Sequence, residues 1–120
     1  MAAAGEAQDA VDWEVLQILA LVGDKWSLLV IGKLRDGPQR FGELQRGVRG
    51  ISQRMLTLTL RKLERDGLVN RTVQAAVPPR VDYRLTALGE SLLGPVLSLV
   101  QWAVDHRDEI VEHRSHHDRP

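Results

Sequence analysis

The chain has no cysteine among its 120 residues. This absence excludes disulfides, thiolate catalysis, cysteine-ligated zinc and thiol redox sensing. Aromatic residues are scarce at 4%, and most of them are tryptophan. No apolar stretch approaches the length of a membrane span, and the Ala-rich start lacks the basic and apolar regions of a signal peptide. These absences predict a soluble, cytoplasmic protein with no membrane partner.

The formal net charge is zero, but the charges are unevenly distributed along the chain. Residues 35–84 hold eleven cations and five anions, a net charge of +6, so the two ends together carry the compensating negative charge. A basic middle between acidic ends is typical of a domain that meets a polyanion with one face. The distribution therefore favours a nucleic-acid partner.

The length supports one domain, because several separate hydrophobic cores need a longer chain. We expect a disordered leader at residues 1–8, a single folded domain at 9–112 and a disordered polar tail at 113–120. The sequence shows no internal repeats or low-complexity tracts.

Apolar residues at helical spacing predict three short helices in the first half of the domain, over about residues 9–22, 24–35 and 40–48. Gly23 and the Gly37-Pro38 pair are expected to separate them. The residues expected to face inward from the second helix are Trp26, Leu29, Val30 and Leu34.

The segment between Ser52 and Gly67 predicts a helix whose two faces differ in chemistry. Ser52 is a good N-cap, and Gly67 can adopt the left-handed conformation that ends a helix. At 3.6 residues per turn, one face carries Met55, Leu56, Thr59, Leu60 and Leu63, and the other carries Arg54, Thr57, Leu58, Arg61 and Arg65. Alone, such a segment is more often an ordinary amphipathic surface helix. Its flanking segments favour a DNA recognition helix instead.

The period changes from helical to alternating after Gly67. Residues 69–73 and 80–85 are the strand candidates, joined by a loop that contains Pro78-Pro79. Thr86 can cap a last helix, which Gly94-Pro95 is expected to interrupt or kink. The predicted fold is mostly α with a small β hairpin, a winged helix-turn-helix.

Three motifs resemble those of the HxlR-type transcriptional regulators of bacteria. They are VGDKW from Val22, the run RFGELQRGVRGISQRMLTLTLRKLERDGLVNR from Arg40, and VPPRVDYRLTALG from Val77. The resemblance covers about residues 11–104. It implies a dimeric winged-helix repressor or activator whose first and last helices build the dimer interface. Many members sense oxidants through a cysteine in the first helix, which this chain lacks.

We predict a sequence-specific, homodimeric repressor that binds an inverted-repeat operator in double-stranded DNA. Arg54 is placed to bond guanine and Gln53 adenine, whereas Leu58 could pack on a thymine methyl or be an incidental surface residue. The candidates for base contact are Gln53, Arg54, Thr57, Leu58 and Arg61. The candidates for backbone contact are Arg40, Ser52, Arg65, Arg71, Arg80 and Arg84. Phosphate contact is the competing role for Arg54 and Arg61.

Two further residue groups suggest ligands. Trp13, Trp26 and Trp102 could form a pocket for a small aromatic effector, although packing in the core or dimer interface is the commoner use of such rings. The histidines towards the C-terminus have spacing that can bind zinc, namely His106, His113, His116 and His117 with Glu109. A polar terminal segment explains them better, so we predict no metal and no cofactor.

The alternative function is a winged-helix protein-interaction module whose basic face docks an acidic partner. The density of arginine on both the recognition helix and the hairpin argues against it. An enzyme is a more distant possibility, because no nucleophile–base pair or glycine-rich phosphate loop is present.

Overall fold

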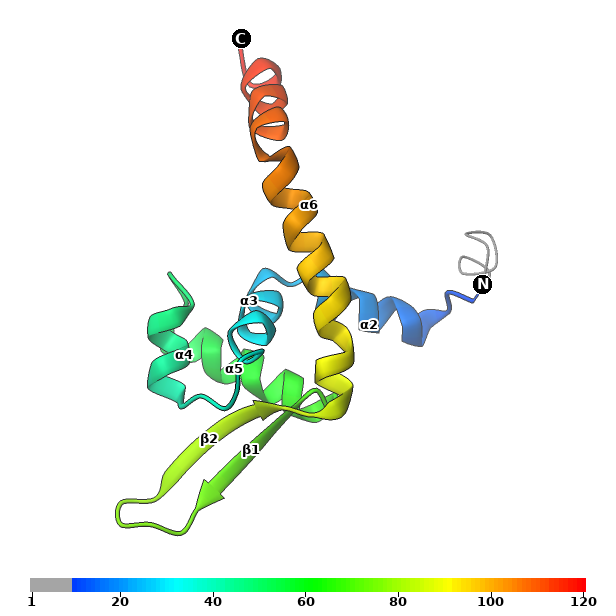
Figure 1. Cartoon of the computed structure of the whole chain (residues 1–120). Coiled ribbons are helices and arrows are strands. Elements are labelled where there is room, and N and C mark those ends of the chain that lie inside the picture. Colours follow the sequence, from blue (N-terminus) through cyan, green and yellow to red (C-terminus); the bar gives the residue numbers. More distant parts are fainter. Residues whose placement is uncertain (1–9) are drawn as a thin grey trace.

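The structure, a computed structural model, describes residues 10–120, so the leader predicted at 1–8 lies outside the described residues. Figure 1 shows a small helical body, a hairpin that projects from it and a long C-terminal helix. The elements are α2 (Trp13–Gly23), α3 (Lys25–Lys33), α4 (Phe41–Gly47), α5 (Gln53–Arg65), β1 (Val69–Gln74), β2 (Arg80–Leu85) and α6 (Ala87–His117). The predicted fold class is confirmed.

Side-chain caps explain where most of the helices begin. The carboxylate of Asp12 accepts a hydrogen bond from the Val15 amide at 3.0 Å, and that of Asp24 accepts from the Trp26 amide at 3.1 Å. The hydroxyls of Ser52 and Thr86 do the same at the starts of α5 and α6, each at 3.0 Å. Each cap satisfies an amide that has no partner within its own helix. The predicted caps at Ser52 and Thr86 are therefore present.

The core lies where α3, α4 and α5 meet, under the base of the hairpin. Its fully buried side chains include Val30, Ile31, Leu34, Leu44, Leu56, Leu60 and Leu63. The inward prediction for Leu29 is wrong, since this side chain is 46% exposed while Ile31 is buried. Because α3 packs against α2, α5 and α6, its buried arc is centred on Val30, Ile31 and Leu34, and Leu29 lies outside that arc.

The hairpin is antiparallel, and its register pairs Val69 with Leu85 and Gln74 with Arg80. A short bridge adds Gln39 to the outer side of β2, where Gln39 and Tyr83 exchange backbone hydrogen bonds of 2.9 and 2.8 Å. This bridge ties the loop before α4 to the base of the hairpin. The hairpin and the helix-turn-helix therefore form one body.

Helix α6 runs without interruption from Ala87 to His117, through Pro95. Of the interruption or kink predicted at Gly94-Pro95, the interruption does not occur. The helix also passes the predicted domain boundary at 112, so most of the segment expected to be a disordered tail is helical. The last turns are rich in Glu, Arg and other residues that tolerate an exposed helix, and Asp118 caps them. The composition of residues 113–120 did not distinguish a polar helix from a disordered polar tail.

Helix α6 stands away from the body for much of its length (Figure 1). Only Gly89 and Val96 are buried on it. The radius of gyration is 17.3 Å, against about 14 Å for a compact chain of this length. This excess reflects the projecting helix and hairpin.

By length and composition alone, α6 could also cross a membrane, and a second candidate arises if α2 and α3, bent by 69°, count as one span. The sequence expectation that no stretch approaches this length was therefore wrong for α6. Gly, Ser and Gln interrupt its apolar residues without adding charge, which hid the run from a search for continuous apolar sequence.

Candidate nucleic-acid interface

The two faces of α5 are divided nearly as predicted. Leu56, Thr59, Leu60 and Leu63 are buried, whereas Gln53, Arg54, Leu58 and Arg61 are exposed and Thr57 is half-buried. Met55 was placed on the buried face but is 36% exposed, because it lies at the edge of the buried arc. The outward face of α5 is not covered by another described element.

The five candidates for base contact lie together. Ser52, Gln53, Arg54, Thr57, Leu58 and Arg61 line one shallow hollow along the outward face of α5. The hollow combines guanidinium donors, an amide that both donates and accepts, and the apolar side chain of Leu58, which is 42% exposed. These are the groups that read base edges in a major groove.

Two hydroxyls in this hollow have fixed roles. The Thr57 hydroxyl donates to the Gln53 carbonyl at 2.9 Å, so it faces a ligand only with its lone pairs. Ser52 accepts from the Met55 amide and keeps its own proton. Thr57 is therefore suited to accept from a base amino group, and Ser52 to donate to a phosphate oxygen.

A second hollow connects α5 to the hairpin. It is lined by Phe41, Thr57, Leu60, Arg61, Glu64, Arg71 and Tyr83. Arg61 of the recognition helix and Arg71 of the hairpin thus border the same surface. Arg65 extends this surface along α5, since it lines a neighbouring hollow together with Leu58 and Arg61.

The three hairpin arginines do not share one face. Arg71 is opposite Tyr83, whereas Arg80 and Arg84 belong to the pairs on the other side of the ladder. Arg84 lies at the base of the hairpin and borders a hollow with Arg35, Pro38 and Glu90. Arg80 lies next to the loop and pairs with the buried carboxylate of Asp82 at 3.4 Å. Arg71 and Arg84 therefore point to different surfaces.

Most cations of the basic middle are available to a polyanion. Among residues 10–120, the ion pairs in this middle use only Arg35, Lys62 and Arg80. Lys62 reaches Asp24, the cap of α3, at 3.5 Å, and so ties the recognition helix to the body. Arg40 caps α4 with its backbone, whose amide donates to the Glu43 carboxylate at 3.0 Å, and its side chain stays exposed.

We expect Arg71→Ala and Arg84→Ala to affect DNA binding unequally. Loss of Arg71 should weaken binding to any duplex about five- to tenfold at low salt and reduce the salt slope by about one, as for one lost phosphate contact. Loss of Arg84 should change affinity less than about twofold, because it lies on the surface away from α5. Fluorescence anisotropy across a salt series measures both. Equal losses would show that the base of the hairpin also meets DNA.

The three tryptophans are not enclosed together within one chain. Trp13 and Trp102 are 71% and 53% exposed, whereas Trp26 is half-buried and packs against the core. Trp102 stacks on His106, with ring centroids 4.6 Å apart. A tryptophan pocket stays a prediction that a second chain would have to complete.

Sequence reasoning missed one acidic residue that shapes the interface. Asp24 caps α3, accepts from Ser27 and pairs with Lys62 on the recognition helix. Its position directly after a helix-ending glycine was a usable cap signal. The pairing with Lys62 depends on a tertiary contact between α3 and α5, which no local pattern reveals.

Comparison with known proteins identifies a matching family and a similar relative. Residues 21–111 match the model of the HxlR-like helix-turn-helix family. The HTH-type transcriptional regulator YybR of Bacillus subtilis is 43% identical over 97 residues, which cover 81% of this chain and 78% of YybR.

Two solved structures are similar to most of the chain. The putative transcriptional regulator ytfH from Salmonella typhimurium has a TM-score of 0.76 and 37% identity, covering 83% of this chain and 89% of that one. The reduced form of the redox regulator HypR has a TM-score of 0.76 and 41% identity, covering 82% and 98%. The chain belongs to the HxlR-like helix-turn-helix family of DNA-binding transcription regulators.

Proposed function

We propose that this protein is a homodimeric repressor that reads an inverted-repeat operator. The observation that carries the proposal is the single hollow on α5 in which the five base-contact candidates lie together. Each protomer would insert α5 into a major groove, and the two half-sites would lie about one helical turn apart. Arg40, Ser52, Arg65, Arg71 and Arg80 would contact the backbone, with Arg84 in a lesser role.

The small size of the domain favours repression over activation. A single small domain that covers its operator blocks polymerase by occlusion, since no further module is available among residues 10–120 to recruit it. HypR is a redox regulator, but this chain has no cysteine, so any signal must act without a thiol. The protein would act in the cytoplasm, where its operator is.

Binding-site selection from random duplexes tests the proposal. The selected sequences should contain an inverted repeat, and affinity for it should exceed that for scrambled DNA by about a thousandfold or more. Affinity for both should fall steeply with salt. Selection that yields no enriched motif, together with capture of an acidic protein by the same basic face, would favour the interaction-module alternative.

Arg54→Ala should act on specificity, and Arg80→Ala on general affinity. Arg54 lies in the hollow on α5, so its loss should cost about 1–3 kcal/mol on the operator, relax the preference at one base pair and change random-duplex binding little. Arg80 lies beside the hairpin loop, so Arg80→Ala should lower the affinity of the protein for the operator and for a random duplex by a similar factor. Anisotropy titrations with both DNAs measure this difference. Equal losses on the two DNAs from Arg54→Ala would assign Arg54 to the phosphates instead.

A further inference from the structure

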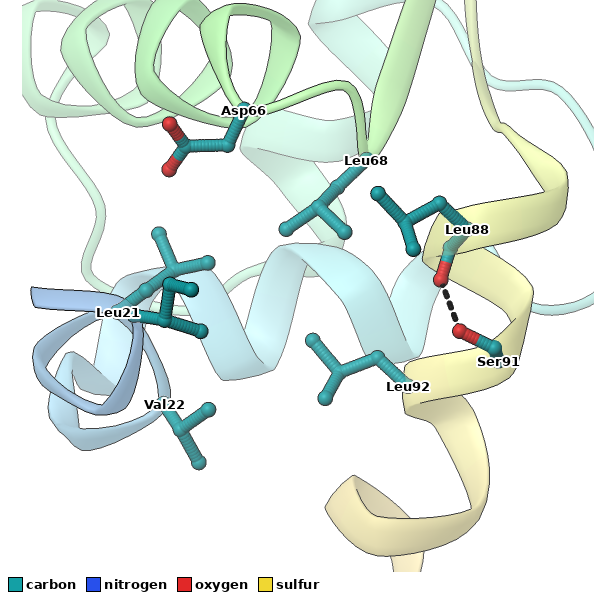
Figure 2. Close-up of a pocket in the computed structure, with 8 residues that line it drawn as sticks. Leu21, Val22, Asp66, Leu68, Leu88, Ser91 and Leu92 are labelled. Atoms are coloured by element: carbon teal, nitrogen blue, oxygen red, sulfur yellow. Dashed lines mark hydrogen bonds between the residues drawn. The ribbon is translucent and has the colours of Figure 1, made fainter. Parts of the chain in front are cut away.

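An apolar cavity of about 380 Å³ lies between α2, α6 and the turn that joins α5 to β1. Figure 2 shows Leu21 reaching it from α2, Leu68 from the turn, and Leu88 and Leu92 from α6. The volume is within the range of small-molecule sites, about 300–1,000 Å³. None of the three tryptophans lines this cavity, so it differs from the pocket expected from the sequence.

Asp66 and Ser91, the polar residues that line the cavity, both present hydrogen-bond acceptors. The Ser91 hydroxyl donates to the Leu88 carbonyl, so it offers a ligand only its lone pairs. The carboxylate of Asp66 takes part in none of the ion pairs found among residues 10–120. No lysine or arginine lines the cavity. A site with apolar walls and only acceptors selects an apolar ligand that carries a donor with positive charge.

We propose that this cavity is an effector site for a small organic cation with an apolar body, such as an arylalkyl amine. The leucines would cover the body, and the ammonium group would donate to the Asp66 carboxylate, which lies on the opposite side of the cavity from Ser91 (Figure 2). The effector role rests on the proposed regulator function, whereas binding itself does not.

A second copy of the chain is a less suitable occupant. Ile18 and Leu88 at the rim are 62% and 57% exposed, so a partner helix could approach the cavity. However, α2 contains no lysine or arginine, so a second α2 laid over the cavity would cover the Asp66 carboxylate without pairing it. Burying an unpaired carboxylate is costly.

The cavity touches both parts of the DNA-binding surface. Asp66 is the C-cap of the recognition helix, and Leu68 directly precedes the first hairpin strand. An occupant that wedges between this turn and α6 would change the angle at which α5 and the hairpin are presented. By reciprocity, the factor by which the amine changes operator affinity equals the factor by which the operator changes amine affinity.

Isothermal titration of the full chain without DNA tests the binding step with three probes that share one ring: 2-phenylethylamine, 2-phenylethanol and 3-phenylpropionate. The amine should bind at least about tenfold more tightly than the alcohol, and the carboxylate most weakly. Asp66→Asn should weaken amine binding about tenfold and leave the alcohol unchanged. Asp108→Asn, an exposed carboxylate on α6 outside the cavity, is the matched control and should bind like the parent.

Leu88→Phe places a larger ring into the cavity and should weaken both the amine and the alcohol. Equal affinities for the three probes, or an Asp66→Asn variant that binds the amine normally, would overturn the proposal. If no probe binds and Leu88→Phe instead weakens self-association, a second copy fills the cavity. If saturating amine binds but leaves the affinity for the operator unchanged, the effector role is overturned. Operator binding measured in the absence of the amine tests the regulator function separately.

Discussion

Gly89→Ala should destabilise the fold more than a glycine-to-alanine substitution at any other described glycine. A Cβ at this position would lie 2.1 Å from the backbone oxygen of Leu68 and 3.1 Å from the Leu85 side chain. The Leu68 oxygen cannot easily retreat, because it accepts the Thr86 amide at 3.0 Å. We expect a loss of about 3 kcal/mol or more in the free energy of unfolding, and a fall in Tm of about 10 °C or more.

Gly94→Ala is the matched control, since Gly94 lies on the same helix and an added Cβ there meets nothing within 4 Å apart from its chain neighbours. This variant should change stability by less than about 1 kcal/mol, because alanine favours a helix interior while its Cβ approaches the ring of Pro95. Thermal unfolding followed by circular dichroism, at equal protein concentrations, compares the two. A Gly89→Ala protein as stable as Gly94→Ala would contradict the close packing of α6 on the turn before β1.

The local features of the fold were predictable because they depend on residues close in sequence. Ser52 and Thr86 act as caps through hydrogen bonds three residues away, and Gly67 has the positive φ of 75° that its terminating role requires. The buried stripe of α5 follows from helical periodicity alone. The prediction that Met55 is buried was wrong because this residue lies at the boundary of the stripe, where contacts with neighbouring elements determine burial.

The features that were missed depend on contacts distant in sequence. Asp82 is one of the polar residues that alternate with apolar ones along β2. It is nevertheless buried, and its carboxylate accepts hydrogen bonds from Gln74 and Arg80. The separation of Arg71 from Arg84 follows from strand register, which the sequence did not specify because residues 75–79, rather than a two-residue turn, join the strands. In the candidate site, the grouping on α5 was foreseeable from one helix, whereas the hairpin contribution required the register.

The exposed apolar residues of α6 form the surface on which the proposed homodimer would place its second protomer. Leu97, Val100, Val104 and Val111 are all exposed and recur at spacings of three, four and seven residues. Such spacing places them on one stripe, as in helices that pair along their length. Exposed apolar residues on α2, among them Trp13, Leu16 and Leu19, add to this surface. A protein partner that covers these stripes explains why α6 is apolar without requiring a membrane. The family's role in DNA binding favours a second copy of the chain as that partner.

Val100→Glu should therefore dissociate the homodimer and, with it, most operator binding. In a two-fold interface the substitution occurs twice, so two carboxylates would enter an apolar contact without partners. The dimer dissociation constant should rise at least about a hundredfold. Because a monomer holds one half-site only, operator affinity should also fall by about a hundredfold or more, whereas random-duplex binding should change much less. Analytical ultracentrifugation and anisotropy measure the two effects.

Ser98→Glu adds the same charge two residues away, on the polar side of α6 that also carries Gln101 and Asp105. It should keep both the dimer and the operator affinity, because its carboxylate stays in water. If Val100→Glu remains a folded dimer with parental operator affinity, the second copy does not bind along this stripe. If the two variants dissociate equally, net charge rather than apolar burial governs association. The pair thus separates a specific helix contact from general electrostatic repulsion.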